Sequence, residues 1–140
     1  IIFVSSYKSG VNAVTPIDGE VIWRNEVISS FQGLSADYSY LYLSDSSSDV
    51  WQLDQRNGAS YWKQTDLHQR RLSMPAVYGD YVVVGDFEGY LHWLSKTDGR
   101  LLGRIEITDE PIVSQPVVVE DTLYVYATDG TLAAVRVLLF

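Results

Sequence analysis

Residues 81–94 read YVVVGDFEGYLHWL, two short runs of β-branched and aromatic residues separated by the polar turn GDFEG. β-branched and aromatic side chains fit the pleated surface of a strand, whereas Gly and Asp favour tight turns. The runs alternate with a period of two, and no amphipathic stretch of helical spacing is visible in the chain. The sequence therefore predicts antiparallel strands joined by hairpins, with no substantial helix.

The same pattern returns at intervals of about 40 residues. One series consists of Asp-Gly or Asn-Gly turns whose glycines are 39 and 41 residues apart, at Gly19, Gly58 and Gly99. A second series consists of turn residues spaced by 39, 40 and 41 residues, at Gly10, Asp49, Gly89 and Gly130. Independent registers that agree on one period indicate an internal repeat.

Four antiparallel strands in a repeat of about 40 residues form one blade of a β-propeller. The strands expected along the chain number three, four, four and three. The predicted fold class is therefore all-β, a partial β-propeller of about three and a half four-stranded antiparallel blades. We expect a single domain built from an incomplete blade, two complete blades and a second incomplete blade, at residues 1–28, 29–68, 69–109 and 110–140.

Composition narrows the classes of function. The 140 residues carry 10 Lys and Arg against 18 Asp and Glu, a formal net charge of −8, and no Cys. No basic field exists to recruit nucleic acid or anionic lipid, and no disulfide or thiolate chemistry is possible. The chain begins with Ile1 and falls short of the four or so blades of the smallest propellers, so we expect a piece of a longer protein.

Two tryptophans occupy equivalent positions in the repeat, four residues after an Asx-Gly turn. The simpler interpretation of Trp23 and Trp62 is packing between blades, and the alternative is an aromatic platform for a ligand. The third repeat has Gly103 at this position, which favours packing. We therefore assign structural roles to five repeat positions, Gly19, Trp23, Gly58, Trp62 and Gly99.

No catalytic, cofactor or metal site is predicted. The two histidines, His68 and His92, lie in different repeats and form no His-x-x-x-His or Ser-His-Asp arrangement. Asp45 and Asp49 loosely suggest a calcium loop, but the required spacing of oxygen ligands and the trailing Glu are missing. A solvated turn is the better interpretation of that segment.

The segment Thr65–Ser73, TDLHQRRLS, is the longest predicted connection between blades. It places two arginines in an otherwise acidic chain, and arginine is enriched in protein interfaces. We therefore take His68, Arg70 and Arg71 as candidate partner-binding residues, with a solvated loop as the alternative. The acidic connection Thr108–Val113 is a second candidate for the same face.

The repeat resembles the quinoprotein-type (PQQ-like) propeller repeat, and more narrowly the BamB family of outer-membrane assembly lipoproteins. The residues that carry the resemblance are YWKQTDL at 61–67, SMPAVY at 73–78 and above all VVGDFEGYLHW at 83–93. Further on, QPV at 115–117 and DGT at 129–131 resemble the end of the family's sequences. The resemblance covers essentially the whole chain and corresponds to the C-terminal part of the family.

The resemblance implies a non-catalytic scaffold. Members of this family are eight-bladed propellers, anchored by lipid to the periplasmic face of the Gram-negative outer membrane. They bind the periplasmic POTRA domains of the central assembly protein BamA and assist the insertion of outer-membrane proteins. This chain has no counterpart of the lipid-bearing Cys, and the family's best-known BamA-contacting loops correspond to blades upstream of Ile1. No contact residue is therefore carried over.

Two alternative functions remain open at this level. One is a fragment of a PQQ-dependent quinoprotein dehydrogenase, which shares the shape of the repeat but needs calcium-binding and cofactor-stacking residues from a whole ring. The other is a generic protein-binding propeller. Because incomplete blades at both ends leave edges and apolar faces uncovered, we also expect self-association, with the N-terminal unit of one copy against the C-terminal unit of another.

Overall fold

The computed structural model describes residues 1–138, which form four antiparallel sheets and no helix. The first sheet contains β1 (Ile2–Ser6), β2 (Gly10–Val14) and β3 (Val21–Asn25). The second contains β4 (Leu34–Ala36), β5 (Tyr40–Ser44), β6 (Val50–Asp54) and β7 (Ser60–Gln64). The third contains β8 (Ala76–Tyr78), β9 (Tyr81–Gly85), β10 (Tyr90–Ser95) and β11 (Leu101–Glu106). The fourth contains β12 (Val117–Val119), β13 (Thr122–Tyr126) and β14 (Leu132–Val135).

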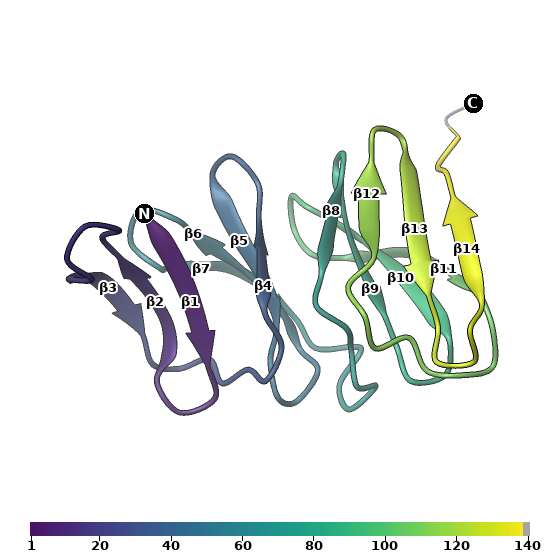
Figure 1. Cartoon of the computed structure of the whole chain (residues 1–140), viewed down its shortest axis with the longest axis horizontal. Helices are drawn as coiled ribbons and strands as arrows, with labels where there is room; N and C mark the ends of the chain where they lie inside the picture. The colour runs from purple at the N-terminus through teal and green to yellow at the C-terminus, as the bar shows by residue number, and fades with distance from the viewer. Residues whose placement is uncertain (139–140) are drawn as a thin grey trace.

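Strands follow chain order within each sheet, and each pairs antiparallel with the next. Figure 1 shows the four sheets side by side in a row, with β1–β3 and β12–β14 at its two ends. The short first strands contact one another, since β8 touches both β4 and β12. The prediction of an all-β partial propeller is therefore confirmed. Among the described residues, no helix offers the length and apolarity needed to cross a bilayer.

A carboxylate shapes the hairpin turn between the two middle strands of a sheet. Asp86 Oδ1 accepts hydrogen bonds from the backbone N–H groups of Glu88 (2.9 Å) and Tyr90 (3.0 Å). Asp45 accepts the equivalent bonds from Ser47 and Asp49 in the second sheet, whereas Ala127 occupies this position in the fourth sheet. Such Asx turns satisfy backbone donors that the ladder leaves free, which explains why Asp recurs at this point of the repeat.

Left-handed residues shape the same turns. Gly89 and Gly130 have φ of 85° and 89°. In the second sheet the left-handed residue is Ser48, with φ of 66°, one residue before Asp49. The Ser48 hydroxyl accepts a hydrogen bond from the backbone N–H of Leu72 (3.2 Å), which holds this residue in the turn.

The core consists of three apolar clusters, one between each pair of neighbouring sheets. The first includes Val11, Leu41, Leu43 and Leu53. The second includes Tyr42, Val50, Val82, Val84 and Leu94. The third includes Val83, Leu91, Ile112, Leu123 and Val125. Burial of each large apolar side chain contributes about 1.5–3 kcal/mol, so the stacking of sheets, rather than any single sheet, holds the molecule together.

Tryptophans of the outer strands fill the outer part of two interfaces between sheets, the one between the first and second sheets and the one between the second and third. The Trp23 ring packs on Gly58 of the second sheet, and the Trp62 ring packs on Gly99 of the third. Both glycines have positive φ, 73° and 75°, and a Cβ at either one would overlap the indole. The structure thus places these tryptophans between sheets, where glycine is required for both its conformation and its lack of a side chain.

The two end sheets each have an outward face that no other sheet covers within residues 1–138. Residues alternate along these strands, one side packing inward and the other lying exposed. On β12–β14 the exposed apolar residues are Val117, Val119, Tyr124, Tyr126 and Leu132. On β1–β3 they are Ile2, Val4 and Ile22. Contiguous exposed apolar surface of this kind marks an interaction face.

Candidate partner-binding site

The three connections between sheets, residues 26–33, 65–75 and 107–116, lie along one side of the row, at the same ends of the strands as the middle hairpin turns (Figure 1, lower edge). We call this side the connection face. Backbone hydrogen bonds attach connections to turns, at Ser46 N–Ser29 O (2.7 Å), Gln69 N–Ser47 O (2.8 Å), Phe87 N–Arg70 O (3.1 Å) and Thr128 N–Pro111 O (3.0 Å). The connection face is therefore a packed surface on a rigid scaffold, where binding residues are commonly found.

Arg70, a predicted partner contact, is engaged within the chain. Its guanidinium donates to Asp86 Oδ2 from Nε (2.8 Å) and lies 3.2 Å from Glu88 Oε2. His92 Nε2 lies 2.7 Å from the same oxygen of Asp86. Burial favours a raised pKa for Asp86, but hydrogen bonds from His92, the Tyr90 amide and Arg70 outweigh it and lower the pKa to about 2. Arg70 thus balances a buried carboxylate, which is a structural role.

His68 lies at the rim of the connection face, with about half of its side chain exposed (52%). Its Nδ1 is 3.2 Å from Asp49 Oδ1, and Lys63 Nζ is 3.3 Å from the other oxygen of the same carboxylate. Asp49 itself is buried. The shared carboxylate positions His68 while leaving its outer edge accessible to a partner.

Arg71 is the predicted residue that remains free to bind. Its side chain is exposed, and it makes no ion pair within residues 1–138. It lines a pocket of about 330 Å³. The other lining residues come from all three connections and one hairpin turn, namely Phe31, Gln32, Asp45, Ser46, Ser48, Leu72 and Val113. The structure therefore brings the 65–75 and 107–116 connections to one site, next to a free guanidinium.

An aromatic pair extends this pocket, and the sequence did not reveal it. Tyr7 and Phe31 stack with ring centroids 4.2 Å apart and planes 13° from parallel. Both rings are exposed, Phe31 at 72%. Tyr7 lies in the turn between β1 and β2, and Phe31 lies in the connection from β3 to β4, so only the fold pairs them. The one signal in the sequence is a large ring among polar neighbours, between Ser30 and Gln32 for Phe31.

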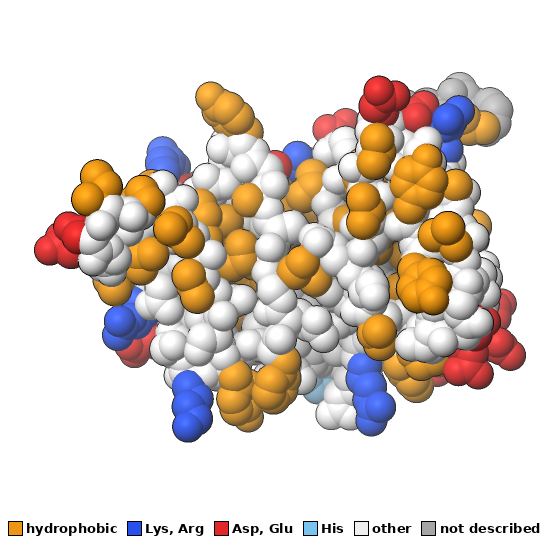
Figure 2. Space-filling view, in the orientation of Figure 1, with side chains coloured by type: hydrophobic (Ala, Val, Ile, Leu, Met, Phe, Trp, Pro, Cys, Tyr) orange, Lys and Arg blue, Asp and Glu red, His pale blue; other side chains and the backbone are white. Residues whose placement is uncertain are grey.

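Charge is unevenly distributed over the connection face. Figure 2 shows apolar and cationic side chains along its lower edge and a group of acidic side chains at the lower right. Asp109 and Glu110, in the third connection, are exposed acidic residues of this face. Val27 and Val113 add exposed apolar surface. An apolar and cationic centre with an acidic margin resembles the composition of protein interfaces, which are enriched in aromatic residues and Arg.

Within residues 1–138 no three His, Cys, Asp or Glu side chains come together in a way that could hold a metal ion. The Asp45 carboxylate, considered as part of a calcium loop, accepts hydrogen bonds from its own turn and from Trp51 Nε1 (2.8 Å). His92 is the equivalent donor to Asp86 in the next sheet. These carboxylates therefore belong to the repeat architecture.

Four-stranded antiparallel sheets that stack face to face, each linked from its outer strand to the inner strand of the next, define a β-propeller repeat protein. Its accessible surface is built from connecting loops. The chain belongs to the family of outer membrane protein assembly factor BamB, because the model of that family matches residues 1–64 and 65–138. The predicted family is thus confirmed.

Curated relatives agree with this assignment. BamB of Shewanella oneidensis is 39% identical over 134 residues, which are 96% of this chain and 34% of the relative. BamB of Pseudomonas aeruginosa is 38% identical over 133 residues, 95% of this chain and 35% of the relative. BamB of Escherichia coli is 31% identical over 135 residues, 96% of this chain and 34% of the relative. The chain therefore spans about a third of the length of the relatives it matches.

Solved structures share the fold. The crystal structure of BamB from Moraxella catarrhalis superimposes with a TM-score of 0.85 at 25% identity, covering 94% of this chain and 40% of that one. The computationally designed Ika4 protein superimposes with a TM-score of 0.81 at 14% identity, covering 96% of this chain and 84% of that one. The second similarity concerns the fold alone.

Proposed function

We propose that this chain is a non-catalytic scaffold of the outer-membrane protein assembly machinery, acting at the periplasmic side of the outer membrane. Membership of the BamB family supports the role in assembly, since the matching relatives carry that name. In this proposal the protein that contains the chain is held at the membrane by a lipid anchor. Its partner is the POTRA region of BamA, and the chain assists the insertion of β-barrel proteins.

The connection face carries the proposed contact with the partner. The single observation behind it is the pocket that joins the free Arg71 guanidinium to the exposed Phe31 ring and to Val113, one residue from each connection. Aromatic and Arg side chains that fill or line a pocket account for most binding energy in protein interfaces. Three separate connections that converge on one pocket also provide a shape that a single loop cannot.

Affinity measurements with purified BamA POTRA domains test this proposal. The gene product that contains the chain is immobilised, and binding is compared for the unmodified protein, Phe31→Ala and Arg71→Glu. We expect each substitution to weaken binding by about tenfold, because loss of an interface anchor costs more than 1 kcal/mol.

Two controls lie at the opposite end of the sheets. Tyr38→Ala removes a fully exposed aromatic ring from the turn between β4 and β5, and Arg100→Glu reverses an exposed charge between β10 and β11. Both should leave the affinity unchanged. Equal losses in the controls and in the connection-face variants, or no POTRA binding at micromolar concentration, would reject the proposed site.

We further propose that the chain of 140 residues self-associates through its two end sheets. The exposed faces of β1–β3 and β12–β14 support this, because each is apolar, like the sheet faces that pack together inside the molecule. A two-fold arrangement, in which β1–β3 of one copy lies against β12–β14 of the other, covers both faces in both copies.

A further inference from the structure

The side of the row opposite the connection face carries two adjoining polar pockets. The first, of about 380 Å³, lies between the β4–β5 and β6–β7 turns, and its lining includes Tyr38, Tyr40 and Arg56. The second, of about 300 Å³, lies between the second and third sheets, and its lining includes Tyr40, Tyr61 and Lys96. We call the two pockets together the tyrosine groove. Its walls come only from the second and third sheets, which both have four strands.

Tyr38 presents its ring to solvent from a backbone that is held in place. Asp37 Oδ1 accepts hydrogen bonds from the backbone N–H groups of Ser39 (2.9 Å) and Tyr40 (2.7 Å), which fixes the β4–β5 turn around Tyr38. The Tyr38 side chain is fully exposed. The ring therefore adds nothing to the core, and both of its faces are open to a ligand.

Tyr61 is held in a fixed orientation in the second pocket. Its hydroxyl donates to Asp54 Oδ2 (3.0 Å), and its ring centroid lies 5.2 Å from that of Tyr40, with the ring planes 88° apart. Arg56 completes the cluster, because its Nη2 donates to the same oxygen of Asp54 (2.7 Å). Tyr61 nevertheless remains 55% exposed. The groove thus offers preorganised aromatic rings, which reduces the entropy lost on binding.

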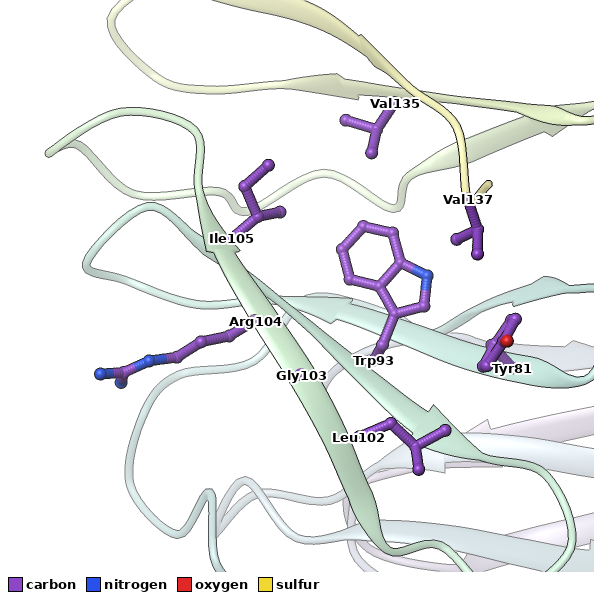
Figure 3. A pocket seen from close by; sticks show the side chains of 8 residues that line it. All are labelled: Tyr81, Trp93, Leu102, Gly103, Arg104, Ile105, Val135 and Val137. Carbon is purple, nitrogen blue, oxygen red and sulfur yellow. The ribbon is translucent and has the colours of Figure 1, made fainter. Parts of the chain in front are cut away.

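The repeat itself shows that the fold does not require this cluster. Ile22 and Leu102 occupy the position of Tyr61 in the first and third sheets, each three residues after the glycine of the Asx-Gly turn. Figure 3 shows this part of the third sheet, where Leu102 lines a groove with largely apolar walls. The positions of Asp54 and Arg56 are taken by Thr15 and Ile17 in the first sheet and by Ser95 and Thr97 in the third. The cluster in the second sheet is therefore available for a role other than folding.

The cations of the tyrosine groove are neutralised within the chain. Arg56 pairs with Asp54 (2.7 Å), and Lys96 Nζ lies 2.8 Å from Asp37 Oδ2. Asp80, which also lines the groove, is exposed. The groove therefore has no excess positive charge to select an anion. Its polar groups also disfavour a purely apolar ligand, which would desolvate them without offering hydrogen bonds.

We propose that the tyrosine groove binds a neutral oligosaccharide through the faces of its pyranose rings. The C–H groups on a pyranose face carry a slight positive charge and pack on the negative face of an aromatic ring. Ser39, Asp80 and Thr97 are exposed polar residues of the same lining and bind the sugar hydroxyls. Two adjoining pockets suit two linked sugar rings. This site goes beyond the proposed function and does not depend on it, because none of its residues belongs to the connection face.

The probe is chitotetraose, a β-1,4-linked oligomer of N-acetylglucosamine whose equatorial substituents leave both ring faces flat. The isotope-labelled chain is titrated with this sugar to about 10 mM, and we expect half-saturation at about 1 mM, a weak affinity typical of an open site. The backbone amide resonances of Tyr38, Tyr40 and Tyr61 should shift. Those of Phe31 and Arg71 on the connection face should not.

A second probe distinguishes the possible sources of the sugar. Cellotetraose has the same linkage as chitotetraose but lacks the acetamido groups. Binding of both probes shows that the ring faces alone are recognised, and binding of chitotetraose alone shows that the ligand is an amino-sugar glycan. Either result supports the proposed site.

Matched variants test the role of the rings. Tyr38→Ala and Tyr61→Ala should each weaken sugar binding by roughly 2- to 10-fold, the value of one aromatic contact. Because Tyr38 is fully exposed, its replacement leaves the fold intact, and Tyr38→Phe keeps the ring face and should retain the affinity. The control is Tyr7→Ala, since Tyr7 is 53% exposed, much like Tyr61, but lies in the β1–β2 turn.

Any one of three results would overturn the proposal. The first is the absence of shifts at the highest concentration of both sugars. The second is an affinity that is the same in Tyr38→Ala, Tyr61→Ala and the unmodified chain. The third is a proline-rich peptide that shifts the same resonances at a lower concentration than either sugar, because the tyrosines then recognise a polyproline segment.

Discussion

Individual residues explain why the repeat keeps glycine at some turns and allows change at others. Gly99 and Gly19 share a left-handed conformation, with φ of 75° and 73°. A Cβ on Gly99 would overlap the Trp62 ring, whereas nothing lies within 4 Å of the same position on Gly19. Replacing the glycine of such a turn by another residue thus has two separable free-energy costs. One is the strain of a left-handed backbone, and the other is steric overlap with a neighbouring ring.

The first prediction uses this difference. Gly19→Ala should reduce the free energy of unfolding by about 1 kcal/mol, the cost of a left-handed L-residue. Gly99→Ala should cost about 3 kcal/mol or more, because the indole must also move and core overpacking adds about 1–3 kcal/mol. Urea denaturation of the two variants measures the difference. Equal losses would contradict the packing described for Trp62.

A second prediction concerns Asp86, whose pKa in the folded chain is about 2, below its ordinary value of 3.8. A carboxylate with a depressed pKa stabilises the fold above its unfolded pKa, and this contribution disappears as the pH falls through the folded value. Between pH 5 and pH 2 the chain should therefore lose roughly 1–2 kcal/mol through this group. In Asp86→Asn, the free energy of unfolding should depend less on pH between pH 5 and pH 2.

The control for this pH dependence is Asp66→Asn. Asp66 is an exposed residue of the 65–75 connection and has no ion pair within residues 1–138. Thermal unfolding followed at several pH values compares the variants. If the stability of Asp86→Asn falls with pH as steeply as that of the unmodified chain, the Arg70–Asp86–His92 cluster does not stabilise the fold.

At the scale of elements, strands and turns could be predicted because their causes are local. Alternation in β9 and β10 and the Asx-Gly turns act within a few residues, so the sequence contains them. In the third sheet the tryptophan lies on β10 and faces Gly103 of β11, and this placement could not be predicted in the same way. It depends on the pairing of Trp93 with Gly103, a cross-strand relation that spacing alone does not define.

The candidate site was predictable only in part. The excess of Arg in residues 65–73 indicated a binding loop, and Arg71 is indeed exposed at the pocket. Arg70 is not free, because Asp86 and Glu88 reach it from a turn in the next sheet. Phe31 joins the site through the stacking of sheets. Contacts between residues far apart in sequence decide which side chains remain available.

A third prediction concerns the stability of elements. β5, β9 and β10 belong to sheets that are covered on both faces, whereas β1 and β14 have one open edge and one open face. Amide exchange should therefore be slowest in β5, β9 and β10 and faster in β1 and β14, with protection factors that differ by at least about tenfold. Exchange measured by NMR tests this order. Uniform protection across all sheets would contradict the picture of stacked units.

At the scale of the whole molecule, the two uncovered apolar faces predict association. Sedimentation of the chain, whose mass is 15.8 kDa, should reveal a species of twice that mass at high concentration. Val4→Lys and Tyr124→Lys, one on each outward face, should each shift the chain to the monomer, since an unpaired charge is costly in an apolar contact. Ile17→Lys, at an exposed apolar residue elsewhere, should not. A monomer at every concentration would reject self-association.

The central claim is that the connection face binds the assembly partner, and photocrosslinking in cells tests it most directly. A photoreactive amino acid is placed at Phe31 or Arg71 of the gene product, and, as controls, at Tyr38 or Tyr61, two exposed positions away from this face. The account predicts crosslinks to BamA from Phe31 and Arg71 and none from the controls. Crosslinks from Tyr38 or Tyr61 without any from Phe31 and Arg71 would contradict it.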